Sequence, residues 1–246
     1  MKKLTTFLLI SLPYLAISQH IGNKNIETNT YDFGTIQSVL VKINADIRIN
    51  AGSSKDEVRI MVDSNLKEFM EVSLDESGRM TLQQTEWIQP SQPITIEITA
   101  SKLNRFQQEN YGTTFIRNIQ GAEFRAMAIV GRVELLGSIN TLHASGEIGI
   151  IDALDLDVDK ANINLWGRGE VLLKSPMEIS GIVEKDALVT YRSGEPKVRT
   201  KGRGEVRLAN KESESVDDSR RFISFRLKNN SDNRINCYVV GIKPDG

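Results

Sequence analysis

The five residues Gly167–Val171 read Gly-Arg-Gly-Glu-Val, and Gly202–Val206 repeat the same letters 35 positions later. A weaker copy, Gly-Arg-Val-Glu-Leu at Gly131–Leu135, precedes the first copy by 36 positions. Short glycine-punctuated segments that recur at a fixed period are typical of solenoid proteins. A spacing near 35 fits two rungs of about 17 or 18 residues each. The stretch from Gly131 to Leu208 therefore predicts a stack of similar rungs.

Apolar and polar residues alternate after these glycines. Val133 and Leu135 alternate with Arg132 and Glu134, and residues 154–159 read Leu-Asp-Leu-Asp-Val-Asp. A period of two predicts strands with one buried and one wet face. Each segment is only about four to six residues long, and no useful helical period lies between them. We therefore predict an all-β fold, a parallel β-solenoid with a small C-terminal β extension; a β-sandwich or a propeller is the alternative.

The first third of the chain is also rich in predicted strands, but it is less regular. Strands are expected within 39–49, at 57–62 and at 93–99, with a single helical turn at 65–70. Residues 71–82 predict a hairpin, because two alternating segments flank an Asp-Glu-Ser-Gly turn. Such irregularity is expected of a cap that closes one end of a solenoid.

Residues 1–18 have the pattern of a secretory signal peptide. A basic start is followed by a short apolar run and by the small residues Ala16 and Ser18, which predicts cleavage after Ser18. The run is too short to span a membrane. Residues 19–32 are polar and are predicted to be a loose lead-in, and residues 33–208 are predicted to form the solenoid domain.

The composition argues for a folded protein without a nucleic-acid partner. Hydrophobic residues make up 39% of the chain, and the formal net charge is −1. Removal of Lys2 and Lys3 with the signal peptide would shift that charge to about −3. Such a balance leaves no basic footprint for nucleic acid.

The C-terminal part differs from the repeats. Residues 209–221 are highly charged and are predicted to be a linker, and residues 222–246 predict two strands of a partial β module. The chain ends on the turn-forming sequence Pro244–Gly246, which predicts that the native protein continues into another strand. Cys237 is the one cysteine, so it is expected either to be buried on a strand or to form an intermolecular disulfide.

These features together resemble a family of secreted Bacteroidetes proteins, the auto-transporter adhesins with a head GIN domain, over about residues 33–208. The resemblance is carried by the strand pair Val39–Ile49 with Gly52, the segment Ile94–Ile98 with Leu103, and the Gly-x-Gly-x-Val segments at Gly167 and Gly202. Family members have small rungs near the end, where this chain has Trp166, Arg168 and Arg203. The resemblance implies a β-helix-like fold and an extracellular or envelope location, and it implies no established activity.

The residue types that catalysis, metal binding or cofactor binding need are sparse. His143 lies near Ser145, but a Ser-His-acid triad also needs an oriented acid and an oxyanion site. A zinc site would need a cluster of Cys and His residues, which the sequence lacks. The segment Gly167–Gly169 precedes a predicted strand rather than a helix, so we interpret it as a rung corner and not as a phosphate loop. We assign no catalytic, cofactor-binding or metal-binding residue from the sequence.

Asp155, Asp157 and Asp159 form an acidic row on one face of a predicted strand. Alternate residues of a strand lie about 6 to 7 Å apart, which would suit a calcium site or a pair of carboxylates that cleaves polysaccharides. A plain solvated face would have the same sequence. All three interpretations stay open from the sequence, with the solvated face preferred.

A second charged feature follows the repeat. Its members are Glu147, Glu170 and Glu205 together with Arg132, Arg168, Arg203 and Arg207. If the glutamates occupy one position of stacked rungs, like charges would align and repel mildly. We interpret the mixture as a charged outer face, and a binding strip for a charged glycan is the alternative.

The sequence therefore predicts an exported, non-catalytic, adhesin-like or scaffold protein that presents a solenoid surface to a glycan or an envelope protein. A carbohydrate-active β-helix enzyme and a structural part of an envelope assembly are the alternatives. The expected location is the periplasm, the outer cell surface or the extracellular space. No cofactor and no membrane span are predicted.

Overall fold

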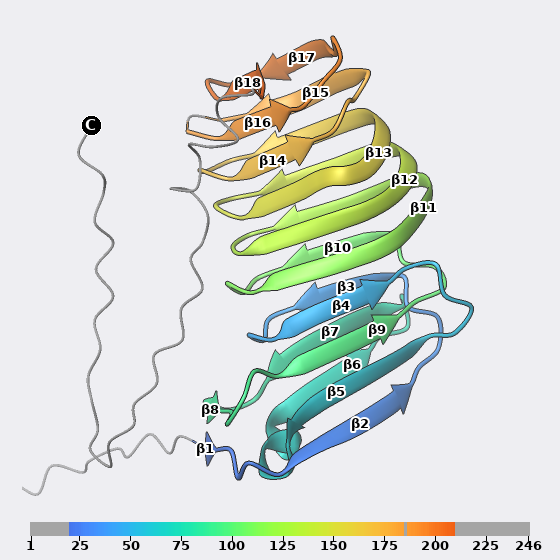
Figure 1. The fold of residues 1–246 in the computed structure, drawn as a ribbon, viewed down its shortest axis with the longest axis vertical. Helices are drawn as coiled ribbons and strands as arrows, with labels where there is room; N and C mark the ends of the chain where they lie inside the picture. The colour runs from blue at the N-terminus through green and yellow to red at the C-terminus, as the bar shows by residue number, and fades with distance from the viewer. Residues whose placement is uncertain (1–19, 185, 210–246) are drawn as a thin grey trace, which may run out of the picture. The chain divides into compact units, whose positions relative to one another are not determined.

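The computed structural model describes residues 20–184 and 186–209, which belong to one compact unit ending at Ala209. Its β-strands form two layers that face each other, a front layer and a rear layer (Figure 1). The predicted signal peptide (1–18), nearly all of the predicted linker (209–221), the predicted module (222–246) and Cys237 lie outside the described residues.

The front layer contains strands from along the whole described chain. From its first edge to its last, it consists of β2 (Ile26–Asp32), β5 (Glu57–Asp63), β9 (Thr95–Thr99), β4 (Asp46–Asn50), the first parts of β11 (Thr113–Ala128), β12 (Arg132–Gly146) and β13 (Ile150–Leu165), then β14 (Glu170–Leu173), β16 (Leu188–Tyr191) and β18 (Glu205–Leu208). From β9 to β18 every pairing is parallel. The prediction of a parallel β-solenoid is confirmed.

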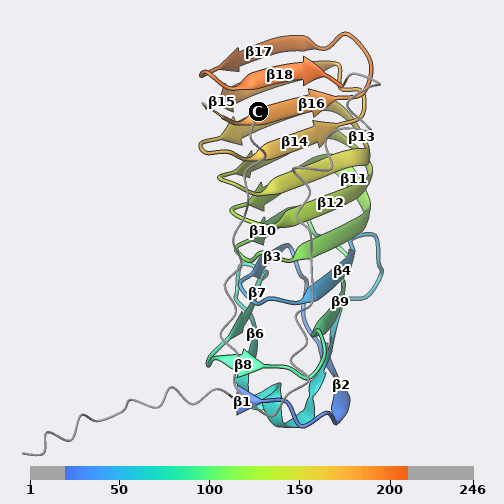
Figure 2. The ribbon, with the colours of Figure 1, turned by 60° about the vertical axis from the view of Figure 1, so that its left-hand side comes forward.

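The rear layer pairs the strands that alternate with these along the chain. It consists of β6 (Met70–Leu74), β7 (Arg79–Gln84), β3 (Ser38–Val41), β10 (Arg105–Gln108), the second parts of β11 to β13, then β15 (Glu178–Val183) and β17 (Lys197–Lys201). Figure 2 shows the two layers stacked rung upon rung. Register partners in adjacent rungs from β12 to β18 are 17 to 20 residues apart, which agrees with the predicted rung length.

Strands β11, β12 and β13 differ from the short segments expected from the sequence, because they are 16, 15 and 16 residues long. Each runs from the front layer through a bend into the rear layer. The register shifts between Ile116 and Ile119 in the β11–β12 ladder, and between Glu134 and Leu136 in the β12–β13 ladder. A bulge bends a strand while pairing continues on both sides, so each of these strands stays one continuous element through the bend.

The core lies between the layers and is built from residues stacked in register. Val133, Ile151, Val171 and Val189 are successive partners on the front layer, and all are buried. Full burial of such a side chain contributes about 1.5 to 3 kcal/mol. The inward-facing side chains of stacked strands thus supply the stability that a single rung lacks.

Glycines mark places where adjacent rungs approach most closely. A Cβ atom at Gly137 would lie 2.1 Å from the Ile119 carbonyl oxygen. The φ angle of Gly137 is +149°. Gly167 does not have a positive φ. A Cβ there would instead lie 2.4 Å from the Glu147 carbonyl oxygen of the preceding rung, so steric contact requires glycine at this corner.

The N-terminal end of the stack is closed by antiparallel strands. Strands β2 and β5 extend the front layer, and the β6–β7 hairpin extends the rear layer. The helical turn predicted at 65–70 is the 3₁₀ helix η1 (Ser64–Phe69), which buries Leu66. Residues 26–32, expected to be a loose lead-in, form β2, because Tyr31 packs against the core and the backbone pairs with β5. A short pair, β1 (His20–Ile21) with β8 (Ile88–Gln89), completes this end.

Candidate functional site

The acidic row predicted from the sequence lies at the bend of β13, with all three carboxylates exposed and with Leu156 and Val158 buried between them. Their surroundings differ. Asp155 lines an apolar pocket, Asp157 Oδ1 lies 2.7 Å from Lys174 Nζ, and Asp159 lines a polar hollow with Glu123 and Lys160. Among residues 20–184 and 186–209 there is no group of three or more metal-ligating side chains.

His143 and Ser145 lie on the rear part of β12 and are both half-buried. His143 Nε2 lies 3.1 Å from Glu123 Oε2 of the adjacent rung. This hydrogen bond and the nearby Arg125 hold the pKa of Glu123 below its usual range. The partner of His143 is therefore an acid of a neighbouring strand, in a cross-strand pair that needs no catalytic role.

The glutamates of the sequence repeat do not stack, which corrects the expectation of aligned like charges. Glu170 pairs in register with Leu188, and Leu188 pairs with Glu205, so a rung separates the two glutamates. Glu147 lies in a turn, where its N–H bonds to the Ala128 carbonyl oxygen. The reason is that the repeat spans two rungs, so identical letters fall on every second strand.

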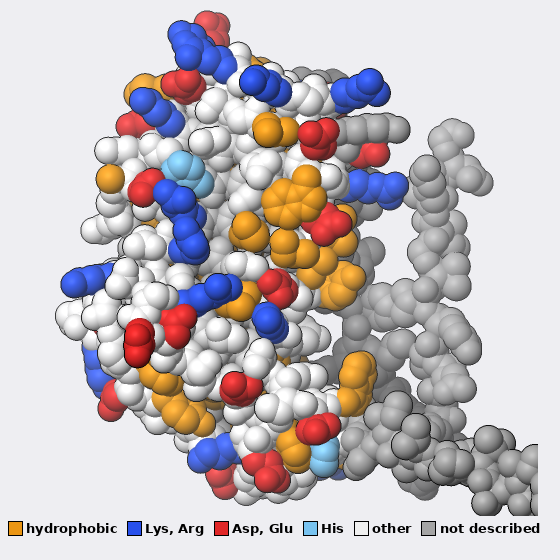
Figure 3. All heavy atoms as spheres, turned by 180° about the vertical axis from the view of Figure 1, so that it is seen from behind, with side chains coloured by type: hydrophobic (Ala, Val, Ile, Leu, Met, Phe, Trp, Pro, Cys, Tyr) orange, Lys and Arg blue, Asp and Glu red, His pale blue; other side chains and the backbone are white. Residues whose placement is uncertain are grey.

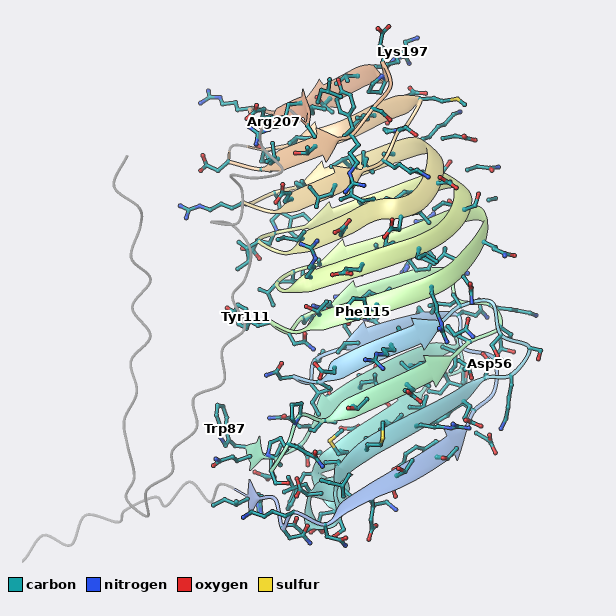
Figure 4. The ribbon with its side chains drawn as sticks, in the orientation of Figure 1. Asp56, Trp87, Tyr111, Phe115, Lys197 and Arg207 are labelled. Carbon is teal, nitrogen blue, oxygen red and sulfur yellow. The ribbon has the colours of Figure 1, made fainter. Side chains whose placement is uncertain are left out.

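A pocket of about 300 Å³ opens on the front layer where β11, β12 and β13 begin to bend. We call it the bend pocket. Its lining includes Phe115, Arg117, Glu134, Leu136, Asp152 and Asp155. Phe115 and Leu136 are 47% and 46% exposed, so an apolar surface meets water beside three carboxylates. Figure 4 labels Phe115 on the outer face of β11.

Arg132 holds two of these carboxylates in place. Its Nε lies 3.0 Å from Glu134 Oε1, and its Nη2 contacts Asp152 Oδ2 on the next strand. The other oxygen of Asp152 accepts a hydrogen bond of 3.1 Å from the Leu154 N–H. The acids of the pocket wall are therefore oriented before any ligand arrives.

Apolar side chains are also exposed along one edge of the stack, at the turns that lead from the rear layer to the front layer. Tyr111, Ile148 and Trp166, in three such turns, are 73%, 40% and 42% exposed. We call these three residues the aromatic edge. Hydrophobic side chains gather along the right-hand edge of Figure 3, which is the left-hand edge in Figure 1. Figure 4 labels Tyr111 at this edge.

Hydrogen bonds fix the first of these turns. The buried Gln108 donates from Nε2 to the Gly112 carbonyl oxygen at 2.6 Å and accepts from Thr114 Oγ1 at 2.7 Å. Asn110 Oδ1 accepts from the Gly112 N–H at 2.9 Å. Because the hydrogen bonds of Asn110 and Gly112 hold the backbone on both sides of Tyr111, the exposed Tyr111 side chain lies on a rigid turn.

Neither the bend pocket nor the aromatic edge was predicted from the sequence. Phe115 and Leu136 occupy outward positions of strands. The alternation of polar and apolar residues predicts that each side chain faces outward, but it does not predict that the two lie beside each other. The aromatic edge had a signal, since Tyr111 and Trp166 each precede a glycine, and the glycine after Trp166 lies in a predicted corner. An aromatic residue at a corner is costly to leave in water, which suggests a use at the surface.

Residues 33–196 match the model of the family described as "putative auto-transporter adhesin, head GIN domain". The chain belongs to this family. The predicted resemblance is thereby confirmed, and the family's description supports an adhesin-like role for this head GIN domain.

Solved structures are similar to this head GIN domain, and one of them shares its fold. A crystal structure from Bacteroides fragilis, titled a putative adhesin, is 16% identical, with a TM-score of 0.60 over 77% of this chain and 99% of the other. A protein from Parabacteroides distasonis, titled a putative lipid binding protein, is 14% identical, with a TM-score of 0.48 over 78% and 100% of the two chains. A comparison with curated proteins finds no match.

Within the described residues, no helix of this head GIN domain is long and apolar enough to cross a membrane.

Proposed function

We propose that this protein is an exported, non-catalytic binding protein that holds an extracellular polymer, a glycan or an envelope protein, against the aromatic edge of its solenoid. The aromatic edge is the observation that carries this proposal. Proteins rarely leave large apolar side chains exposed in a row unless a partner covers them. Membership of the adhesin family agrees with binding as the task.

The dimensions of the aromatic edge favour an extended partner. The turn that holds Tyr111 precedes β11, and the turn that holds Trp166 follows β13, so the two are three rung steps apart. Strands in a sheet are spaced by about 4.8 Å, which places these side chains roughly 14 Å apart along the stack. One small molecule would not span that distance, whereas a polymer chain would.

The chemistry of the aromatic edge also suits an interface. Tyr and Trp present large apolar faces together with a polar group, and they are enriched where binding energy concentrates. Exposed Glu147 and Arg168 lie in the same turns and supply a charged rim of both signs. The rigid backbone of the turns keeps the entropic cost of binding low.

The test applies the exported chain, Gln19 to Gly246, to immobilised extracellular polysaccharides and purified matrix proteins, and assays the same polysaccharides for cleavage. We expect binding without cleavage. The double variant Tyr111→Ser with Trp166→Ser should bind about tenfold or more weakly, because it removes two anchors. Met177→Ser is the matched control, since Met177 is 71% exposed and precedes β15 at the opposite edge.

Three results would overturn the proposal. The first is that no polymer binds, and the second is that a polysaccharide is cleaved, which would make the protein an enzyme. The third is that the double variant binds as tightly as the unaltered chain, which would move the binding surface away from the aromatic edge.

A further inference from the structure

We propose that the bend pocket binds a single neutral sugar ring. This inference rests on the proposed function, since it names one class of polymer, a glycan, and a second place on the solenoid where a unit of that glycan is held. The observation behind it is that the exposed side chains of Phe115 and Leu136 lie in one pocket with oriented carboxylates and the guanidinium of Arg117.

The apolar part of the pocket fits one face of a sugar. The C–H groups of a pyranose gather on its ring faces, and such a face packs well on an aromatic ring that is open to solvent. Phe115 provides this ring, and Leu136 on the neighbouring strand extends the surface. The same two residues would not be this exposed if they served only the core.

The polar part of the pocket fits the rim of a sugar. Asp155 is exposed and can accept hydrogen bonds from ring hydroxyls, and exposed Arg117 can donate to hydroxyl or ring oxygens. Glu134 is half-buried and is held by Arg132. A hydroxyl group both donates and accepts, so a polyhydroxylated ring can satisfy this mixed lining.

The charge of the pocket favours a neutral ring over a basic peptide. Three carboxylates line it, but Arg132 contacts two of them, and Arg117 contributes a second positive charge to the same lining. The remaining formal charge of these five groups is about −1, too little for a strong demand for a cation. The volume of about 300 Å³ is at the lower end of ligand sites, which suits one ring better than a peptide segment.

The bulges explain why a pocket exists at this place. The two register shifts lie between the strand partners that line it, at Ile116/Ile119 and Glu134/Leu136. A bulge turns side chains away from the flat surface of a sheet, and bulges are common beside binding sites. The hollow therefore follows from how the chain bends from the front layer to the rear layer.

The test titrates the exported chain with the methyl glycosides of glucose, galactose and mannose and measures saturation-transfer NMR. We expect transfer to the ring C–H protons of at least one glycoside. Phe115→Ala and Asp155→Asn should each weaken its binding about tenfold. Trp87→Ser, which alters an exposed aromatic residue outside both the bend pocket and the aromatic edge, should leave it unchanged. Thermal melts of all variants verify that the fold persists.

The outcomes separate this inference from the proposed function. Failure of all three glycosides to bind, or binding that Phe115→Ala leaves unaltered, would overturn the pocket while the polymer assay at the aromatic edge still stands. Binding of a trilysine peptide that needs Asp155 would also overturn it, by showing a cation site. If the unaltered chain binds a glycoside but no polymer, the role of the aromatic edge is overturned and the pocket stands.

Discussion

At the scale of single residues, Asp63 is a buried carboxylate that joins separate segments of the N-terminal cap. It is fully buried and accepts hydrogen bonds from the Lys24 N–H at 2.7 Å, the Ser91 N–H at 2.8 Å and the Ser91 hydroxyl at 2.7 Å. Burial alone would raise the pKa of Asp63, but the bonds from Ser91 and Lys24 outweigh it and hold that pKa below its usual range.

A pH prediction follows from this arrangement. Because the pKa of Asp63 is lower in the folded than in the unfolded chain, its stabilising effect is present above about pH 4 and is lost as the pH falls through the folded value. Asp63→Asn should lower the free energy of unfolding at pH 7 by about 1 to 3 kcal/mol. The variant should also lose less stability than the unaltered chain between about pH 5 and pH 3.

Urea unfolding at pH 7, 5 and 3.5 measures both effects. Asp46→Asn is the control, because Asp46 begins β4 as an exposed residue. If the pH dependence of Asp63→Asn runs parallel to that of the unaltered chain, then Asp63 is not the group that titrates.

The sequence could not have predicted these residue-scale contacts. Asp63 directly follows the strand expected at 57–62, where the pattern suggests a solvated turn. Its donors lie 39 and 28 positions away. Lys24 precedes β2 and Ser91 precedes β9, and both of these strands pair with β5. The positions of Asp157 and Val158, by contrast, were predictable, because alternation within one strand decides which side chain is exposed.

At the scale of elements, the stack depends on close contact between consecutive rungs. Gly137→Ala should lower the free energy of unfolding by about 2 kcal/mol or more, because the new Cβ would lie 2.1 Å from the Ile119 carbonyl oxygen. Gly121→Ala is the matched control: its φ is +130°, close to the +149° of Gly137, but nothing lies within 4 Å of the added Cβ. Thermal and urea unfolding compare the two.

If the two alanine variants are equally stable, backbone strain rather than contact between rungs is what requires glycine at Gly137. A large loss at Gly121 and a small one at Gly137 would contradict the close approach of β11 and β12 altogether.

The elements themselves were largely predictable, and their continuity was not. The hairpin at 71–82 appears as β6 and β7, and the helical turn at 65–70 appears as η1. The residues of β13 were expected as separate short strands, because apolar alternation stops briefly at Asp159 and Lys160. Alternation reports burial within a strand, and it does not report whether a bend interrupts the backbone pairing.

At the scale of the whole described unit, the two ends of the stack are unequal. The first end is closed by antiparallel strands and by buried Leu66. The last strands, β17 and β18, each pair with one neighbour and are mostly exposed, with Val198 and Leu208 facing water. The sequence predicted the cap, because its first third is irregular, but it gave no measure of how open the other end is.

This inequality predicts a gradient of local stability. In a stack that interacts only with its neighbours, an end rung opens more easily than a central one. Amide hydrogen exchange, followed by mass spectrometry on the full chain, should be fastest in β17 and β18 and slowest in the central strand β12, which pairs with β11 and β13 along most of its length. The capped strand β5 should exchange slowly, since it pairs on both sides. Equal protection of β18 and β12 would contradict the gradient, and a chain ending at Ala209 would then reveal whether residues 210–246 protect the last rung.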